Sequence, residues 1–436
     1  MRGGNRHVAL VVLEAAALVF LAALCFQPPP GVRAFTRRGT LLAVLVLSPL
    51  WLALVYLLPL PAGLWAAIPG RSLYADLLSG AGMPVDQWRP MSLVPDATGT
   101  SLLAGIPLVA AFLGGLGTRL PQLKLILKVL VGAACLEVAF GLLQAAGGRE
   151  LFFGLGVGRP FGTFANPNHF ANYVAMALAA YVWLAWLGLW HSRRVHHMRP
   201  SEMRRKVALY AFGAMLLLTG VLMSRSRGAA LGGLSAALAA FAVALTVGSR
   251  ERNWRMTMLV LGGAVLAGIS IVGFNTIASR FDVQTVASAA SLRTQIAWTS
   301  LSGAMAFSPV GSGWGTYADV YPRFQPASIT ERVHHAHQDY AEMLFEGGIF
   351  AVLLMAVFAW LAITRAVYLV RAAVRNRRLR REEMAAAICG IGLLGFLLHS
   401  LVEFNMHIPA NAIIASLFAG IYLRPLKPKE EEVPGD

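Results

Sequence analysis

The chain has 436 residues, of which 57% are hydrophobic and only 13% are charged, and its mean hydropathy is +0.62. Because soluble globular chains carry about 25% charged residues, this composition excludes a soluble enzyme of ordinary composition, and its high apolar content excludes intrinsic disorder. The net charge of +16 does not indicate a nucleic-acid groove, since most basic residues cluster in short loops between apolar runs. The sequence therefore predicts an all-α polytopic integral membrane protein.

Eleven apolar runs are long enough, or nearly so, to cross a bilayer, which takes about 20 helical residues. In chain order they lie near 8–26, 40–60, 101–118, 123–144, 168–190, 207–224, 229–248, 256–277, 349–369, 384–402 and 409–423. The last run is short, so we expect about eleven transmembrane helices, within a range of about ten to twelve. The three cysteines, Cys25, Cys135 and Cys389, lie inside apolar runs with neither disulfide nor metal spacing.

The loops between these runs differ in their content of arginine and lysine, and the positive-inside rule makes the basic loops cytoplasmic. The basic loops contain Arg33, Arg37 and Arg38; Arg119 and Lys124; Arg193, Arg194, Arg204, Arg205 and Lys206; Arg250, Arg252 and Arg255; Arg371, Arg375, Arg377, Arg378, Arg380 and Arg381; and Arg424, Lys427 and Lys429. The opposite face then holds the N-terminus and the segments 61–100, 145–167, 224–228, 278–348 and 403–408. With no internal repeat found, we predict one membrane domain over 1–436, ending in a disordered cytoplasmic tail at 425–436.

The first polar cluster precedes the run that starts near 168. Asn166 is a good N-cap residue, and Pro167 suits the first helical position. Because a helix N-terminus attracts anions and Arg159 lies just upstream, the cluster fits an anion site that includes Asn168. A turn capped for folding alone explains the same residues equally well, and both interpretations stay open.

The second cluster, Ser224-Arg225-Ser226-Arg227-Gly228, places two arginines on the face that the counting rule disfavours for positive charge. The planar, permanently charged guanidinium matches phosphate oxygens bidentately. Snorkelling to lipid headgroups is the alternative, but lysine would serve it equally well. We favour a functional role for Arg227, and less strongly for Arg225.

The third cluster lies in the longest extramembrane segment, 278–348. We expect an amphipathic helix near 283–307 that carries Arg293 and Trp298, a glycine-rich turn at 311–315, and a second helix from about Glu331 into the span near Ile349. On that second helix His334 and His337 share a face, as two ligands of one metal ion can. A third ligand would come from Glu331, Asp339 or elsewhere.

We rank the metal interpretation second and expect no metal. A neutral histidine near pH 7 suits activation of a sugar hydroxyl, so one histidine of this cluster is the candidate general base. On an unbroken helix Glu346 points away from His337, so we favour a structural role for it over one that orients the imidazole, and we count it with Asn166 and Asn168 as a supporting residue. The polar residues that crowd 399–409 fit helix-end capping and packing as well as function, and Glu14 and Glu137 are isolated intramembrane carboxylates without an evident partner.

Taken in order, these motifs resemble the O-antigen ligase/polymerase family of bacterial membrane glycosyltransferases. They are Gly162-Thr163-Phe164 with Asn166-Pro167-Asn168, then Ser226-Arg227-Gly228, then Arg293 with Trp298, then His337-Gln338 with Glu346 and Gly348. Each motif alone is weak, but their order and shared placement on one face make the resemblance, from about 90 to 410, fairly specific.

The resemblance implies a many-helix protein of the bacterial inner membrane with a large periplasmic loop, here 278–348. It implies transfer of a glycan from undecaprenyl pyrophosphate to a periplasmic acceptor hydroxyl, without cofactor or metal, in lipopolysaccharide or surface polysaccharide biosynthesis. Arg227 and Arg293 match the family's donor-phosphate arginines and His337 its proposed base, while Arg159 matches less well. Members commonly have twelve transmembrane spans with both ends inside, whereas we count eleven spans in this sequence.

The sequence does not choose among three acceptors. These are lipid A core, the growing glycan itself, as in a polymerase, and a protein hydroxyl. A different class, a flippase or transporter for lipid-linked glycan, predicts polar residues along a central path and repeated halves, and neither is evident in the sequence.

The charge distribution predicts that 278–348 is extracytoplasmic and 371–383 cytoplasmic. Single cysteines placed in these two segments should therefore react oppositely with a membrane-impermeant thiol reagent in intact cells. Labelling of 371–383 from outside would reverse the whole orientation.

Overall fold

The computed structural model describes residues 7–26, 37–84, 86–147, 159–195, 199–248 and 283–425, and this part of the chain is almost entirely helical. The first half contains α1 (His7–Phe26), α2 (Arg37–Val46), α3 (Ser48–Leu57), α4 (Ala62–Ala67), α5 (Ser72–Gly80), α6 (Pro95–Gly117), α7 (Leu120–Gly147), α8 (Pro167–Val195), α9 (Pro200–Met223), the π-helix η3 (Ala229–Leu234) and α10 (Ser235–Val247). The second half contains α12 (Val283–Ala306), α13 (Tyr317–Val320), the 3-10 helix η5 (Tyr321–Arg323), α14 (Asp339–Asn376), α15 (Arg381–His399), the 3-10 helix η6 (Asn405–His407) and α16 (Pro409–Leu423).

The prediction of an all-α polytopic membrane protein is confirmed. Within the described residues, eight helices are long and apolar enough to cross a membrane, or nine if the bent pair α2–α3 forms one span. The eight correspond to predicted runs. The run at 40–60 is that pair, bent by 60°, and the run at 409–423 is the shorter apolar helix α16. The run at 256–277 and the tail at 426–436 lie outside the described residues.

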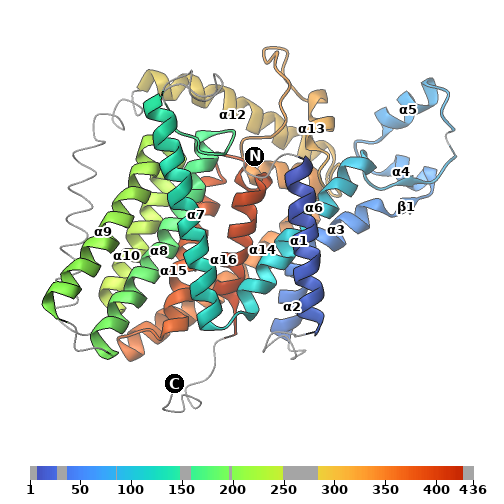
Figure 1. The fold of residues 1–436 in the computed structure, drawn as a ribbon. Helices are drawn as coiled ribbons and strands as arrows, with labels where there is room; N and C mark the ends of the chain where they lie inside the picture. Colours follow the sequence, from blue (N-terminus) through green and yellow to red (C-terminus); the bar gives the residue numbers. More distant parts are fainter. Residues whose placement is uncertain are drawn as a thin grey trace.

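The helices form a bundle around α8, which packs against α7, α9, α10 and α15 (Figure 1). The share of α8 that is buried, 83%, is the largest of any candidate span. Its buried positions include many alanines, which let neighbouring helices approach closely where lipid provides no hydrophobic drive. These alanines are Ala171, Ala175, Ala177, Ala179, Ala180 and Ala185.

Described turns that contain or border the basic segments meet at one end of the bundle. The backbone N–H of Leu379 donates to Val247 O at 3.3 Å, and the guanidinium of Arg424 donates to Thr118 O. Turns that are far apart in sequence therefore share this end, as the alternation of basic loops requires. Which side of the membrane this end faces stays a prediction.

At the other end α12 lies across the bundle (Figure 1). The predicted helix at 283–307 is confirmed as α12, but the helix predicted from Glu331 is wrong, because α14 begins only at Asp339. His337 has a left-handed φ of 51°, which a continuing helix does not allow. The segment before it is held irregular by Gln325, whose side chain accepts from the backbone N–H of Val333 at 3.2 Å.

A kink at Gly348 separates the first turns of α14 from its long apolar part. Gly348 has φ 47° and ψ −130°, outside the helical region. A side chain here would strike the carbonyl oxygen of Pro309, and the backbone N–H of Ile349 donates to that same oxygen at 2.8 Å. The turn that contains Pro309 thus packs against the kink and fixes where the polar start of α14 lies.

Residues 59–90 form a small lobe beside the bundle (Figure 1). The strands β1 (Pro59–Leu60) and β2 (Arg89–Pro90) pair antiparallel, with Pro59 opposite Pro90. The fully buried Arg71 donates to the carbonyl oxygens of Met91 and Gly311, so it ties the lobe to the glycine-rich turn. Burial lowers the pKa of Arg71 to about 10, which leaves it charged at neutral pH.

Candidate functional site

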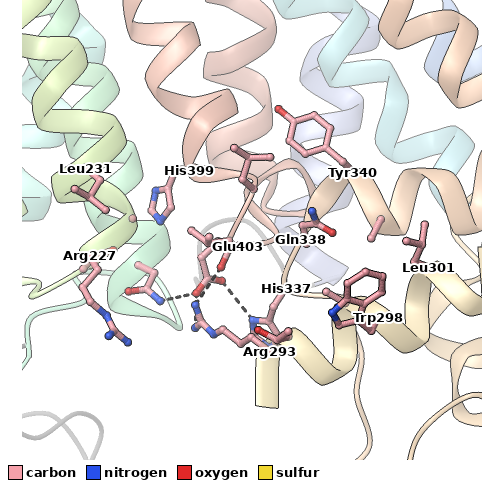
Figure 2. Close-up of a pocket in the computed structure, with 18 of the residues that line it drawn as sticks. Arg227, Leu231, Arg293, Trp298, Leu301, His337, Gln338, Tyr340, His399 and Glu403 are labelled. Carbon is pink, nitrogen blue, oxygen red and sulfur yellow. Dashed lines mark hydrogen bonds and ion pairs between the residues drawn. The ribbon is translucent and has the colours of Figure 1, made fainter. Parts of the chain in front are cut away.

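A cavity of about 900 Å³ lies at the end of the bundle that α12 crosses. Its walls come from the segment before α8, the turn after α9, η3, α12, the start of α14 and the turn after α15, which are far apart in sequence. Figure 2 shows Arg227 on one side of Glu403, and His337 and Trp298 on the other. The structure therefore brings the three sequence clusters together around one space.

Among the residues that the structure describes, four arginines and a single carboxylate line this cavity. The arginines are Arg159, Arg225, Arg227 and Arg293, and the carboxylate is that of Glu403. The guanidinium groups of Arg225 and Arg227 make no hydrogen bond or ion pair with the residues that the structure describes. Because no described residue compensates the charges of Arg225 and Arg227, the cavity is suited to an anionic ligand.

Hydrogen bonds within the turn at 224–228 fix the backbone that carries Arg225 and Arg227. The hydroxyl of Ser224 accepts from the backbone N–H of Ser226 at 3.2 Å, and Arg225 takes a left-handed φ of 52°. Gly228 follows directly and packs so closely on the ring of His399 that a Cβ atom would collide with it. The next residues form the π-helix η3, an irregularity often found at functional sites.

The start of α8 has the predicted cap. α8 begins at Pro167, and the side chain of Asn166 accepts from the backbone N–H of Asn168 at 2.8 Å. Arg159 donates from Nε to Ser224 O at 2.7 Å and from Nη2 to Asn168 Oδ1 at 3.3 Å. Arg159 therefore joins two walls of the cavity, and much of its donor capacity is used within the protein.

Glu403 is the centre of the site. Only 1% of its side chain is exposed, and its Oε1 accepts from Arg293 Nη2 and from Asn168 Nδ2, both at 2.6 Å. Its Oε2 lies 3.5 Å from His337 Nδ1 and 3.6 Å from His169 Nε2. Burial disfavours ionisation, but the two imidazoles and the Arg293 guanidinium hold the pKa of Glu403 well below its usual range.

His337 points its Nδ1 at Glu403 and is 30% exposed toward the cavity. The carboxylate favours the tautomer that carries its proton on Nδ1, which leaves Nε2 as a base. His334, by contrast, is exposed and does not line the cavity. The metal pair of His334 and His337 considered from sequence is therefore wrong, because no helix places them on a common face.

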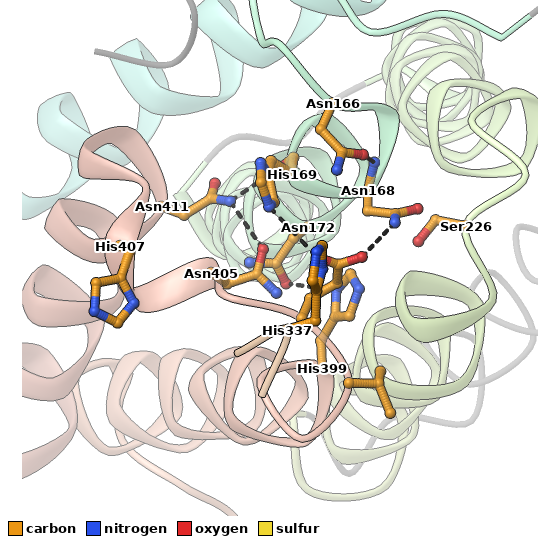
Figure 3. A network of polar contacts seen from close by, with 12 residues as sticks. Asn166, Asn168, His169, Asn172, Ser226, His337, His399, Asn405, His407 and Asn411 are labelled. Carbon is orange, nitrogen blue, oxygen red and sulfur yellow. Dashed lines mark hydrogen bonds and ion pairs between the residues drawn. The ribbon is translucent and has the colours of Figure 1, made fainter. Parts of the chain in front are cut away.

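Several buried polar atoms around Glu403 have no hydrogen-bond partner among the described residues (Figure 3). They include His169 Nε2, His337 Nδ1, His399 Nε2, Asn172 Nδ2, Asn405 Nδ2 and Glu403 Oε2. Native interiors satisfy nearly all buried polar groups, and the exceptions gather where ligands bind or chemistry occurs. This concentration beside four arginines marks the same place as the functional site.

Two other carboxylates named from the sequence have structural roles. Glu346 does not line the cavity; it accepts from the backbone N–H of Tyr317 at 2.9 Å and so supports the loop after the glycine-rich turn. Glu137 has partners after all: it accepts from the backbone N–H and the hydroxyl of Thr163, at 2.8 and 2.7 Å. It thereby braces the turn that precedes α8.

Sequence reasoning missed the importance of Glu403, together with His169 and the aromatic ring of Phe404. The ring centre of Phe404 lies 4.6 Å from that of His169 and 4.9 Å from that of His337. A signal was present, since Glu403 and Phe404 belong to the crowded polar stretch 399–409. Capping of α15 explained that stretch equally well until the structure brought it beside α8 and α12.

Residues 212–356 match the family model described as O-antigen ligase. The matched region contains Arg227, Arg293 and His337, whereas Glu403 and His169 lie outside it. No curated protein matches the sequence.

Removal of the Glu403 carboxylate should destabilise the protein. Loss of one partner of a buried charge pair costs about 3–5 kcal/mol, and we expect the lower end for Glu403→Ala because 39% of the Arg293 side chain is exposed to water. Glu403→Gln still accepts hydrogen bonds, so it should lose less stability than Glu403→Ala. Thermal unfolding in detergent measures the loss of stability, and Glu331→Ala, a change at an exposed residue, is the control. Equal unfolding temperatures for Glu403→Ala and the control would contradict the central role of Glu403.

Proposed function

We propose that this chain, whose residues 212–356 match the family model described as O-antigen ligase, is a membrane glycosyltransferase that transfers a glycan from undecaprenyl pyrophosphate to an acceptor hydroxyl. The proposal extends to the setting: a multi-pass protein of the bacterial inner membrane, with its cavity on the periplasmic side. It also extends to the partners, which are the lipid-linked donor, membrane lipids and an acceptor on lipid A core, glycan or protein.

The observation that carries the proposal is the charge of the cavity. Four arginines and one carboxylate are found among its described lining residues, and Arg225 and Arg227 make no hydrogen bond or ion pair with any described residue. A pyrophosphate carries several negative charges, and arginine forks bind its oxygens in pairs. The same groups stabilise the charge that develops when pyrophosphate departs as the leaving group. Arg227 is the main donor ligand, and Arg293, Arg225 and Arg159 complete the positive surface.

His337 supplies the base. Its Nε2 takes the proton from the acceptor hydroxyl, the hydroxyl oxygen forms a bond to C1 of the donor sugar, and the bond from C1 to the pyrophosphate oxygen breaks. The undecaprenyl pyrophosphate leaves with the electron pair. Glu403 acts as a positioning residue, because it faces Nδ1 of the imidazole and also holds Arg293. The step uses no metal at the reacting atoms.

A knockout tests the reaction class against the flippase alternative. Loss of a ligase or polymerase should leave undecaprenyl-linked glycan accumulated on the outer face of the inner membrane, because the donor is flipped but not consumed. Accumulation on the cytoplasmic face would contradict a transferase and support a flippase. Accessibility of the glycan to an added glycosidase or lectin in spheroplasts distinguishes the two outcomes.

Arg227 and His337 should be needed for different steps. Arg227→Ala should impair both donor binding and transfer, because the guanidinium holds the pyrophosphate in the bound and departing states. Arg227→Lys should restore little of the binding or the transfer, since lysine keeps the charge but lacks the two-pronged guanidinium that binds phosphate oxygens in pairs. His337→Ala should bind donor lipid nearly normally and lose about a hundred- to ten-thousandfold in transfer rate.

Donor-lipid binding in nanodiscs, measured beside transfer activity at matched expression, separates these effects. The exposed His334→Ala is the control for His337→Ala and should keep normal transfer. Substantial transfer by His337→Ala would remove the proposed base. Normal binding and transfer by Arg227→Ala would remove the donor-site assignment.

A further inference from the structure

We propose that His335, Glu342 and His407 form a binding site for one divalent cation, with Zn²⁺ the best match, next to the cavity and distinct from it. The site links the segment before α14, the first turn of α14 and the 3-10 helix η6. Its role is to hold the positions of His337 and Glu403, and no step of the transfer passes through the ion.

The three ligand atoms converge as a metal site requires. His335 Nδ1 lies 2.9 Å from Glu342 Oε1, and His407 Nε2 lies 3.2 Å from the same oxygen. All three ligand atoms lie within 4.8 Å of one another. Zn²⁺ binds nitrogen and oxygen ligands at about 2.0–2.2 Å, so an ion among these three atoms needs only small side-chain movements. Two histidines and one glutamate with a fourth position open form a common zinc ligand set.

The surrounding hydrogen bonds are those that orient metal ligands. The other nitrogen of His407, Nδ1, faces Asp339 Oδ1 at 3.0 Å, which directs Nε2 toward Glu342. Metal-bound histidines almost always donate their second N–H to such a carboxylate or carbonyl. The other oxygen of Glu342 accepts from the backbone N–H of Ala336 at 2.8 Å, so Oε1 remains for the ion. The backbone N–H of Met406 fixes Asp339 in the same way, at 3.0 Å.

The local charge supports a dication independently of this geometry. Asp339, Glu342 and Glu346 are all buried on neighbouring turns at the start of α14. Among the described residues, Asp339 and Glu342 form ion pairs only with the imidazoles of His335 and His407, and Glu346 forms none. Burying carboxylates without sufficient positive charge is costly, and a divalent cation would balance them.

The site is separate from the transfer cavity. None of its three ligands lines that cavity, and Figure 3 shows His407 apart from the network of His337 and His399. In sequence, however, His335 lies two residues before His337, and His407 lies four residues after Glu403. The ion would thus fix both segments that present the base and its carboxylate.

The test uses wild-type protein purified with a tag that contains no histidine. We expect about one zinc per chain by elemental analysis, a fall in unfolding temperature after chelation, and recovery with added Zn²⁺, because a ligand that binds only the folded state stabilises it. Co²⁺ added to the chelated protein should give the visible absorption of a tetrahedral site. Glu342→Gln and His407→Gln should each abolish the zinc-dependent shift.

The adjacent, exposed His334→Ala is the matched control and should keep zinc and the shift. His337→Ala should also keep zinc while losing transfer, which separates this proposal from the proposed function. Absence of bound zinc together with an unfolding temperature that neither chelator nor Zn²⁺ alters would overturn the site. Equal zinc loss in His334→Ala would assign the metal to the surface instead. The zinc content and the unfolding temperature of the wild-type protein are sufficient to test the site, so the test remains valid even if a variant does not fold.

Discussion

The site depends on one buried carboxylate. Glu403 lies in the turn after α15 and contacts Asn168 from α8, Arg293 from α12 and His337 from the segment before α14. A buried charge is stable only when its partners surround it, so these four segments must meet in one arrangement. The same carboxylate sets the orientation of an imidazole and of an arginine. The fold and the proposed chemistry therefore depend on the same contacts.

Around this carboxylate lie positive charges that the described residues do not neutralise. Arg159 and Arg293 donate hydrogen bonds to backbone or side-chain acceptors, whereas Arg225 and Arg227 are not paired with any described residue. The first two arginines connect walls of the cavity, and the other two make it suitable for the anionic ligand that we propose. Positive charge that is held in place beforehand needs little rearrangement when a leaving group becomes negative.

The beginning of α14 shows how backbone geometry separates two polar sites. The left-handed residue His337 ends the irregular segment, and the kink at Gly348 ends the polar turns. Between them, Asp339 and Glu342 face His407 and His335, while His337 faces Glu403. An unbroken helix from 331 would have spread these histidines around its surface and directed His337 elsewhere.

Composition and hydropathy determined the class of this protein and most of its spans, because a helix in lipid must be apolar along its whole length. The types and order of Arg227, Arg293 and His337 contributed to the resemblance to O-antigen ligases, and residues 212–356 match that family model. Only the tertiary structure identified Glu403 as the partner of His337, and separated His335 from His334. These residues lie in turns and irregular segments that only the tertiary fold brings together. A linear pattern records the periodicity of one segment but not which other segment that one contacts.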